Sequence, residues 1–223
     1  MLCLSHREVR DLGAFIGVLS SPLGFPDSAS WRREVIARGQ QLLEVDRAVF
    51  GLEWDATHPV EDVGIDPAAT PAFIDYYHQF DEAHQERRRR AMPVVGIRHE
   101  LATGWPSHPE FRHDFLRRFQ LDVGVGMGHD VAPGAPCFCA FYSELDAPDA
   151  FEEHVVPILQ LAYPAFCAGL DTVFRVRGLR AEFARLIDQV TDGFLLVGPA
   201  GNVLHQNPAL QWMLAADPQS QLQ

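Results

Sequence analysis

Cysteine and histidine are the residues of this 223-residue chain with the most specific chemistry to offer. Cys137 and Cys139 lie two positions apart in an apolar stretch, so in a strand both side chains point to the same face. Their thiols could bind a metal together with Cys167, His129 or His113, or could act as a redox switch. Cysteine is also among the most buried residue types and packs as a small hydrophobic group. We therefore expect reduced, metal-free thiols.

Motifs of common enzymes are not found in the sequence. It has no Gly-x-Ser-x-Gly elbow, His-Glu-x-x-His pair, P-loop or kinase signature, and its ten histidines match no common zinc spacing. The glycines at 124, 126 and 128 lie within a predicted strand and open no helix, so they are not a dinucleotide fingerprint. No motif for a bilin, a haem or a flavin is present either. We expect a protein that is not an enzyme, with its cofactor unknown.

Charge and composition limit the kinds of partner that this chain can bind. The net charge is −12 and all 18 basic residues are arginine, which argues against a chain that itself binds nucleic acid. The basic run 87–90 is expected at a solvated helix end. The N-terminus lacks the layout of a signal peptide, and no apolar run approaches the roughly 18 residues that span a bilayer. We expect a cytoplasmic protein without a membrane partner.

The clearest structural pattern is a pair of alternating strands over 122–131 and 136–143. A four-residue connection with a proline and a glycine joins them, which predicts a β-hairpin. The three glycines share one face of the first strand, where another group could approach closely. An α+β fold with an antiparallel sheet flanked by helices fits this pattern better than a doubly wound parallel sheet.

Helical periodicity and turn residues give the remaining elements. In chain order we expect helices over 9–19 and 31–43, a strand from 47, a loop over 58–71, a helix over 72–90, a strand or turn over 94–97, a helix over 110–119, a proline-bent helix over 149–170, an interruption at Gly178, a helix over 180–190, a small hairpin over 194–207 and a helix over 209–214.

Four stretches resemble a known family. They are the opening 6–12 with the strand 47–51, the helix and hairpin over 111–142, the segment 161–166 around Pro164, and the run Asp192-Gly193-Phe194-Leu195-Leu196-Val197 followed by 201–209. Together they resemble the N-terminal sensory region of bacterial LuxR-type transcriptional regulators. The resemblance implies a GAF-like sensory domain over 1–172, then a linker helix and a partial PAS-like segment over 173–223. It also implies a DNA-binding helix-turn-helix, for which we expect no room after Leu214.

A small-molecule site is the function that this resemblance implies, because the pocket of GAF folds lies between the sheet and the helices that cross it. The residues that chain order places near that space are Trp54, Tyr77, Phe80, Trp105, His129, Cys139 and Phe141. Aromatic residues at such spacings also form ordinary cores. Two functions stay open: a ligand-gated sensor domain, and a dimerisation or scaffold domain without a ligand.

Dimerisation is expected through helices. One apolar stripe runs along the 180–190 helix at Phe183, Leu186, Ile187 and Val190, and a second runs along the first helix at Leu12, Phe15, Ile16 and Leu19. A symmetric partner is a common way to bury such a stripe. The alternative is that the stripe of the 180–190 helix packs on the small hairpin of the same chain.

Overall fold

The computed structural model describes residues 4–52, 60–80, 93–97, 108–132, 135–143, 148–198 and 201–216. The chain divides into two compact units, Met1–Val173 and Phe174–Gln223. The expected boundary lies between residues 172 and 173. Both units mix helices and strands, and the larger one contains a five-stranded antiparallel sheet, so the expected α+β class is confirmed.

The sheet of unit 1 has the strand order β2-β1-β5-β4-β3, and each neighbouring pair is antiparallel. Its strands are β1 (Arg47–Leu52), β2 (Glu61–Val63), β3 (Val94–Gly96), β4 (Gly124–Ala132) and β5 (Ala135–Tyr142). The predicted central hairpin is confirmed, because β4 pairs with β5 and Met127 lies opposite Cys139. The predicted loop over 58–71 is wrong in two places, and the first is its end, where residues 69–71 begin helix α3 (Ala69–Asp75). The second is the segment 61–63, which forms the edge strand β2 and is stabilised by pairing with β1.

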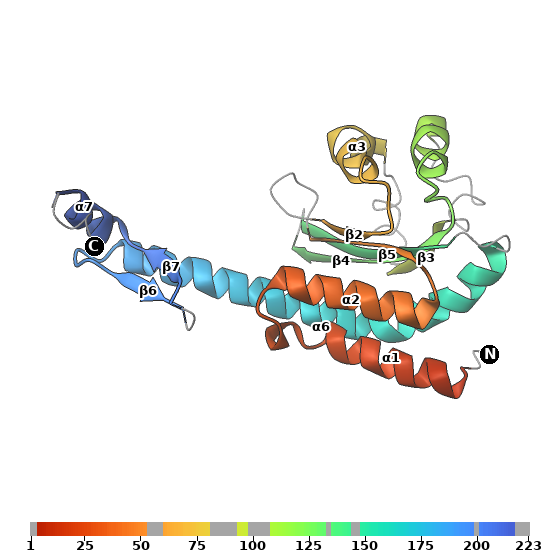
Figure 1. Cartoon of the computed structure of the whole chain (residues 1–223), viewed down its shortest axis with the longest axis horizontal. Helices are drawn as coiled ribbons and strands as arrows, with labels where there is room; N and C mark the ends of the chain where they lie inside the picture. Colours follow the sequence, from red (N-terminus) through yellow and green to blue (C-terminus); the bar gives the residue numbers. More distant parts are fainter. Residues whose placement is uncertain are drawn as a thin grey trace. The chain divides into compact units, whose positions relative to one another are not determined.

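One face of the sheet is covered by helices α1 (His6–Leu19), α2 (Ser28–Leu43) and α6 (Pro148–Asp188), with the short η1 turn (Pro22–Gly24) between the first two (Figure 1). Local signals fix where these helices begin. Ser5 and Glu8 form a capping box at α1, and the Asp27 carboxylate accepts a hydrogen bond from the Ser30 N–H at α2.

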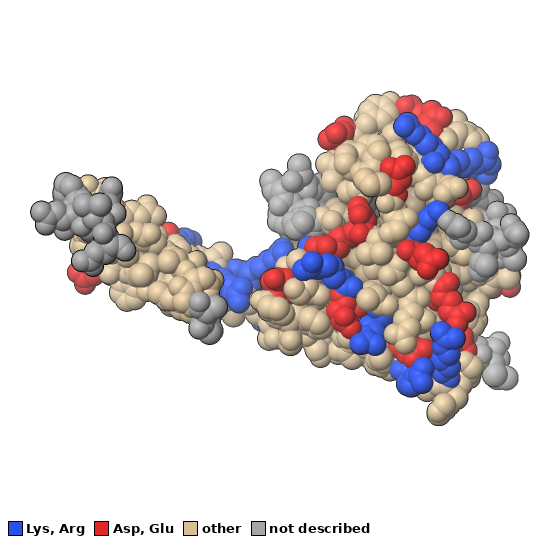
Figure 2. Space-filling model, in the orientation of Figure 1, with Lys and Arg blue, Asp and Glu red and all other residues tan. Residues whose placement is uncertain are grey.

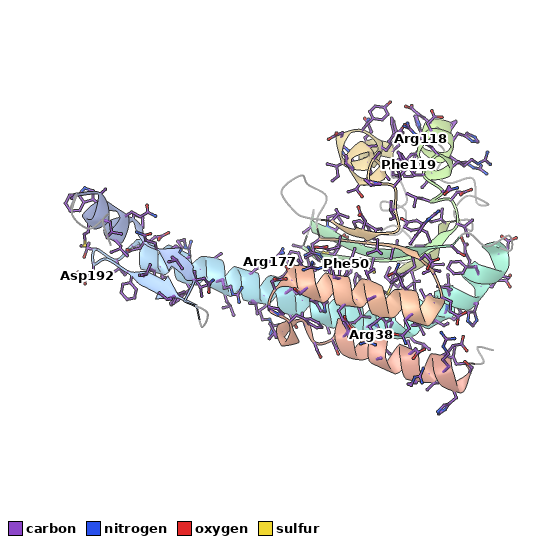
Figure 3. All side chains as sticks on the ribbon, viewed as in Figure 1. Arg38, Phe50, Arg118, Phe119, Arg177 and Asp192 are labelled. Carbon is purple, nitrogen blue, oxygen red and sulfur yellow. The ribbon has the colours of Figure 1, made fainter. Side chains whose placement is uncertain are left out.

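Aromatic rings fill the space between this face and its helices. The Phe50 ring of β1 lies 5.3 Å from Trp31 of α2 and 5.7 Å from Phe166 of α6 (Figure 3). Phe141 of β5 lies 6.1 Å from Phe15 of α1. All five rings are fully buried, and burying each stabilises the fold by roughly 1.5–3 kcal/mol. This layer is the main core of unit 1.

The opposite face is covered by α3 (Ala69–Asp75), the short η2 helix (Tyr77–Phe80) and η3 (Phe111–Arg117) (Figure 1). A single helix over 72–90 was predicted. The chain instead leaves helical geometry at Tyr76, whose backbone angles are −141° and −52°, and η2 follows. The predicted helix over 110–119 is present as η3, whose hydrogen bonds are of the π type. The residues 81–90 of the first prediction lie outside the described residues.

Helix α6 is continuous over 41 residues, so the predicted interruption at Gly178 is wrong. A glycine inside a helix costs only about 1 kcal/mol, and the residues around Gly178 include good helix formers. The predicted bend sites, Pro157 and Pro164, both lie inside this helix.

Unit 2 consists of the end of α6 from residue 174, the hairpin β6 (Leu195–Val197) and β7 (Val203–Gln206), and α7 (Pro208–Ala216). Its central residue is the fully buried Asn207. The Asn207 Oδ1 accepts from the backbone N–H groups of Phe194 and Leu210, at 2.8 and 3.0 Å. Its Nδ2 donates to the Ile187, Val190 and Asp192 carbonyls at 3.2, 3.2 and 2.9 Å. One side chain thus joins the end of α6, the start of β6 and the cap of α7.

Candidate ligand-binding face

Strand alternation gives the two faces of the sheet different characters. Phe50, Met127, Cys139 and Phe141 point to the α1–α2–α6 side, where none of them has exposed surface. Burial raises the pKa of the Cys139 thiol far above its ordinary value, so the group stays neutral. This face is a filled hydrophobic core.

The other face is partly lined by glycine. On β5, Phe138, Ala140 and Tyr142 alternate with the core residues and point to this side. Directly opposite them on β4 lie three glycines: Gly128 faces Phe138, Gly126 faces Ala140 and Gly124 faces Tyr142. A Cβ at Gly51 of β1 would strike the Phe138 ring, so this ring lies over β1. A Cβ at Gly124 would strike the Tyr142 ring, so this glycine is already covered, whereas at Gly126 and Gly128 the β4 side of the face consists of backbone.

An apolar group that we call the sheet cluster occupies this face. It consists of the buried Val49, Phe138 and Ala140, with Val60, Ile65 and Tyr142 packed against them. A second group, the aromatic cluster, belongs to the helices above. Its buried members are Ala69, Phe111, Phe115, Leu116, Phe119 and Leu121, and Phe73, Tyr77 and Phe80 pack against them.

Ring contacts hold the aromatic cluster together. Phe115 lies 4.9 Å from Tyr77, 5.3 Å from Phe111 and 5.3 Å from Phe119. The Arg118 guanidinium lies 5.1 Å from the centre of the Phe119 ring, at the top of this layer (Figure 3). Within the described part of the chain, Ile65 and Tyr142 are the side chains that pack against both clusters. Among the described residues, Ile65 and Tyr142 thus join the aromatic cluster to the sheet cluster.

Two nitrogen atoms beside the aromatic cluster are shielded from solvent without a hydrogen-bond partner among the described residues. They are His108 Nδ1 and Arg112 Nε. The His108 ring stacks on Phe80 with 4.0 Å between the ring centres. Leaving a buried polar atom unpaired costs about 1–3 kcal/mol, and a bound acceptor removes that cost. Arg112 can only donate, whereas the role of the His108 nitrogen depends on its tautomer.

A separate polar cluster links β4 to α6. His129 Nδ1 lies 3.2 Å from the Tyr163 hydroxyl and 3.4 Å from Cys167 Sγ, and His129 Nε2 lies 3.9 Å from Asp171 Oδ1. Burial raises the pKa of both Tyr163 and Cys167, so the thiol is not an activated nucleophile. Among the described residues, no three His, Cys, Asp or Glu side chains are arranged to hold a metal ion.

The predicted site residues do not share one place. Cys139 and Phe141 lie in the filled core, Tyr77 and Phe80 lie in the aromatic cluster, and the sheet separates the two pairs. His129 lies on the core side, beside α6. The other two predicted residues, at positions 54 and 105, lie outside the described residues.

The prediction from chain order missed the residues of the glycine-lined face. It placed the odd-numbered residues of β5 at the site, whereas the sheet cluster uses the even-numbered Phe138 and Ala140. The strand alternation identifies both faces of β5 but not which one lies under the helices of the site. The glycines of β4 were the available signal, since they mark the face that other groups can approach.

No family model matches the chain, and no curated protein sequence does. Comparison with solved structures finds similar chains at low identity. One is the LBD domain of VqsR from Pseudomonas aeruginosa, with a TM-score of 0.47 and 12% identity over 73% of this chain and 97% of that one. Another is CepR2 from Burkholderia cenocepacia, an N-acylhomoserine-lactone-dependent LuxR-family transcription factor, with a TM-score of 0.49 and 19% identity over 73% of this chain and 96% of that one. No family membership follows from matches of this strength.

Proposed function

We propose that this chain is a signal-sensing regulatory domain of a LuxR-type bacterial transcription regulator. Unit 1 would be its GAF-like sensor domain and unit 2 its linker helix and PAS-like segment. A small molecule would bind between the sheet cluster and the aromatic cluster. The observation that carries the proposal is the glycine-lined face of β4 on the side of the sheet that the aromatic cluster covers, together with the two unpaired nitrogens of His108, which stacks on Phe80, and of Arg112 on η3.

The side chains around this face define a class of ligand. Apolar and aromatic walls with a few polar groups are the usual design of small-molecule sites. The glycines of β4 offer a flat surface to a ring or an alkyl chain, and Arg112 offers a donor to a carbonyl or carboxylate oxygen. The proposed ligand is therefore a largely apolar molecule that carries at least one acceptor oxygen.

The wider proposal has three further parts. The protein acts in the cytoplasm, it is not an enzyme, and a homodimer through helices carries the sensed signal to DNA-binding helices. Within the described residues, burial raises the pKa of the Cys167 thiol in the polar cluster at His129, which argues against this thiol as a nucleophile. The alternative is a dimerisation or scaffold domain without a ligand, which the exposed apolar side chains of unit 2 favour.

Native mass spectrometry of the purified chain separates the two functions. A sensor domain is expected to carry a small-molecule adduct, either retained from the host or taken up from 1-naphthoic acid, an apolar ring with one carboxylate. Ala140→Phe fills the sheet face, and Arg112→Met removes the donor, so both variants should lose the adduct. Ala132→Phe at the exposed end of β4 and Arg117→Met at the exposed surface of η3 are the matched controls.

Either of two results overturns the ligand proposal. Wild-type protein without any adduct, before and after incubation with 1-naphthoic acid, would leave the scaffold function. An adduct that persists in both Ala140→Phe and Arg112→Met would place the ligand away from the glycine-lined face.

A further inference from the structure

The two shielded nitrogens at the start of η3 belong to side chains one helical turn apart. The Arg112 backbone N–H donates to the His108 carbonyl at 3.2 Å, and residues four positions apart on a helix carry their side chains on the same side. His108 Nδ1 and Arg112 Nε are both shielded from solvent without a partner among the described residues. Phe111 and Phe115 follow the same spacing and stack with 5.3 Å between their ring centres. The nitrogens thus lie beside the rings of the aromatic cluster.

The charge of Arg112 has no counterion in the described part of the chain, where no ion pair joins it to a carboxylate. Glu110 accepts a hydrogen bond from the Tyr76 hydroxyl instead, and Asp114 is exposed. The segment 108–118 carries three arginines and two histidines against two acids, although the whole chain has a net charge of −12. Basic side chains lie over the layer of α3 and η3, beside acidic ones (Figure 2). This locally basic segment favours an anion over a cation as its ligand.

The stack of His108 on Phe80 restricts the direction of the shielded nitrogen. The ring centres are 4.0 Å apart and the ring planes are inclined by only 18°. Such packing holds a binding group in place before its ligand arrives, which lowers the entropic cost of binding. His108 Nδ1 donates in the tautomer that carries the proton there, and Arg112 Nε donates at all times. The two side chains therefore present two donors to one ligand.

We infer that these two nitrogens bind the carboxylate of an apolar monocarboxylic acid. This inference rests on the proposed ligand site and names the charge of its ligand. A carboxylate has two oxygens, and so offers one acceptor to each nitrogen. A neutral carbonyl or amide oxygen satisfies a donor but leaves the guanidinium charge without a partner, and a hydrogen bond between ionised groups is roughly twice as strong as one between neutral groups. The apolar body of the acid would contact the rings of Phe80 and of Tyr77, which lies 4.9 Å from Phe115.

Isothermal titration calorimetry of the full chain with 1-naphthoate and 1-naphthamide tests the charge of the ligand. The two probes share one ring system and nearly the same shape, and only the first carries an anionic end. We expect the wild type to bind naphthoate at least about tenfold more tightly than naphthamide. Arg112→Met removes the charge and the Nε donor, whereas His108→Phe keeps an aromatic ring on Phe80 and removes Nδ1. Each variant should lose most of the preference for naphthoate.

The chain offers a matched control for each variant. Arg117→Met and His113→Phe make the same substitutions at exposed positions of η3, so both should keep the wild-type preference. An unchanged circular dichroism spectrum shows that a variant is folded.

Three results overturn the inference and leave the ligand site in place, provided that Ala140→Phe abolishes the binding. They are naphthamide binding as tightly as naphthoate, a preference for naphthoate that persists in both Arg112→Met and His108→Phe, and a ligand retained from the host that has no acidic group. If neither probe binds the wild type and no adduct is retained, the inference and the proposed sensor function fall together.

Discussion

Replacing Asn207 by Asp separates the two roles of this side chain. The carboxylate of the variant still accepts from the N–H groups of Phe194 and Leu210, and Asp caps helices as well as Asn does. The amide hydrogens that reach the carbonyls at 187, 190 and 192 are lost, however, and a negative oxygen faces those carbonyl oxygens instead. Asn207→Ala removes both roles.

The hydrogen bonds of Asn207 determine how much stability each variant is expected to lose. One amide group has two hydrogens, so it satisfies two of the three carbonyls at a time. Losing two such bonds costs roughly 2–3 kcal/mol, and losing the cap in the Ala variant costs about 1 kcal/mol more. A unit of about 50 residues rarely has more than about 3–5 kcal/mol of stability from its own core. Asn207→Ala, and Asn207→Asp to a similar extent, should therefore unfold unit 2.

Hydrogen exchange followed by mass spectrometry measures the stability of each unit separately. In both variants, amides of 174–216 should lose their protection, whereas amides of the unit 1 sheet should exchange as in the wild type. Asn202→Asp, the same substitution at an exposed turn residue, is the control and should change neither unit. Wild-type protection in Asn207→Asp would refute the reasoning, because it would show that the cap alone matters and the three carbonyls do not.

Three further predictions concern unit 1. The fully buried Arg32 pairs with Glu61 at 3.0 Å, so Glu61→Gln should lower the free energy of unfolding by about 3 kcal/mol in urea denaturation. Glu34→Gln, which breaks the exposed pair with Arg38, should lower it by only about 0.5 kcal/mol. Equal effects of the two variants would contradict this prediction. The Cys137 and Cys139 thiols are buried, so they should resist Ellman's reagent in the folded protein. Elemental analysis should find no stoichiometric zinc. Rapid labelling of the folded protein, or one zinc per chain, would contradict this prediction. Hydrogen bonds from Ser5 hold the pKa of Glu8 below its ordinary 4.5. The stability that they contribute is therefore present above pH 4.5 and is lost as the pH falls through the lower pKa of Glu8 in the folded state. Ser5→Ala should raise the pKa of Glu8 in a carboxyl NMR titration, and an unchanged pKa would count against the capping box.

The parts of the fold that could be predicted from the sequence are those whose signal is local. Alternating side chains and a proline-glycine connection mark the β4–β5 hairpin, and Asn207 with Pro208 marks the start of α7. The strand β2 had no such signal, because Glu61 and Asp62 are polar. Its place depends on pairing with β1 and on the ion pair to Arg32, both of which join residues far apart in sequence.

The candidate site was less predictable for a related reason. Periodicity assigns Phe138 and Phe141 to opposite faces, but only the packing of α1 and α6 shows which face is closed. The continuity of α6 through Gly178 is likewise a balance of small helix propensities over many residues, which a single breaker residue does not decide.

The two faces of the central sheet also determine how such a sequence can change over generations. Each residue of β5 belongs to a single face, so Phe138 and Ala140 can be exchanged without altering the packing of Cys139 or Phe141. Under the proposed ligand site, substitutions on the glycine-lined side would change what the domain recognises, while the side covered by α1, α2 and α6 would keep its packing. Specificity would then diverge between descendants at a cost in stability confined to the sheet cluster, because Phe138 and Ala140 are themselves buried.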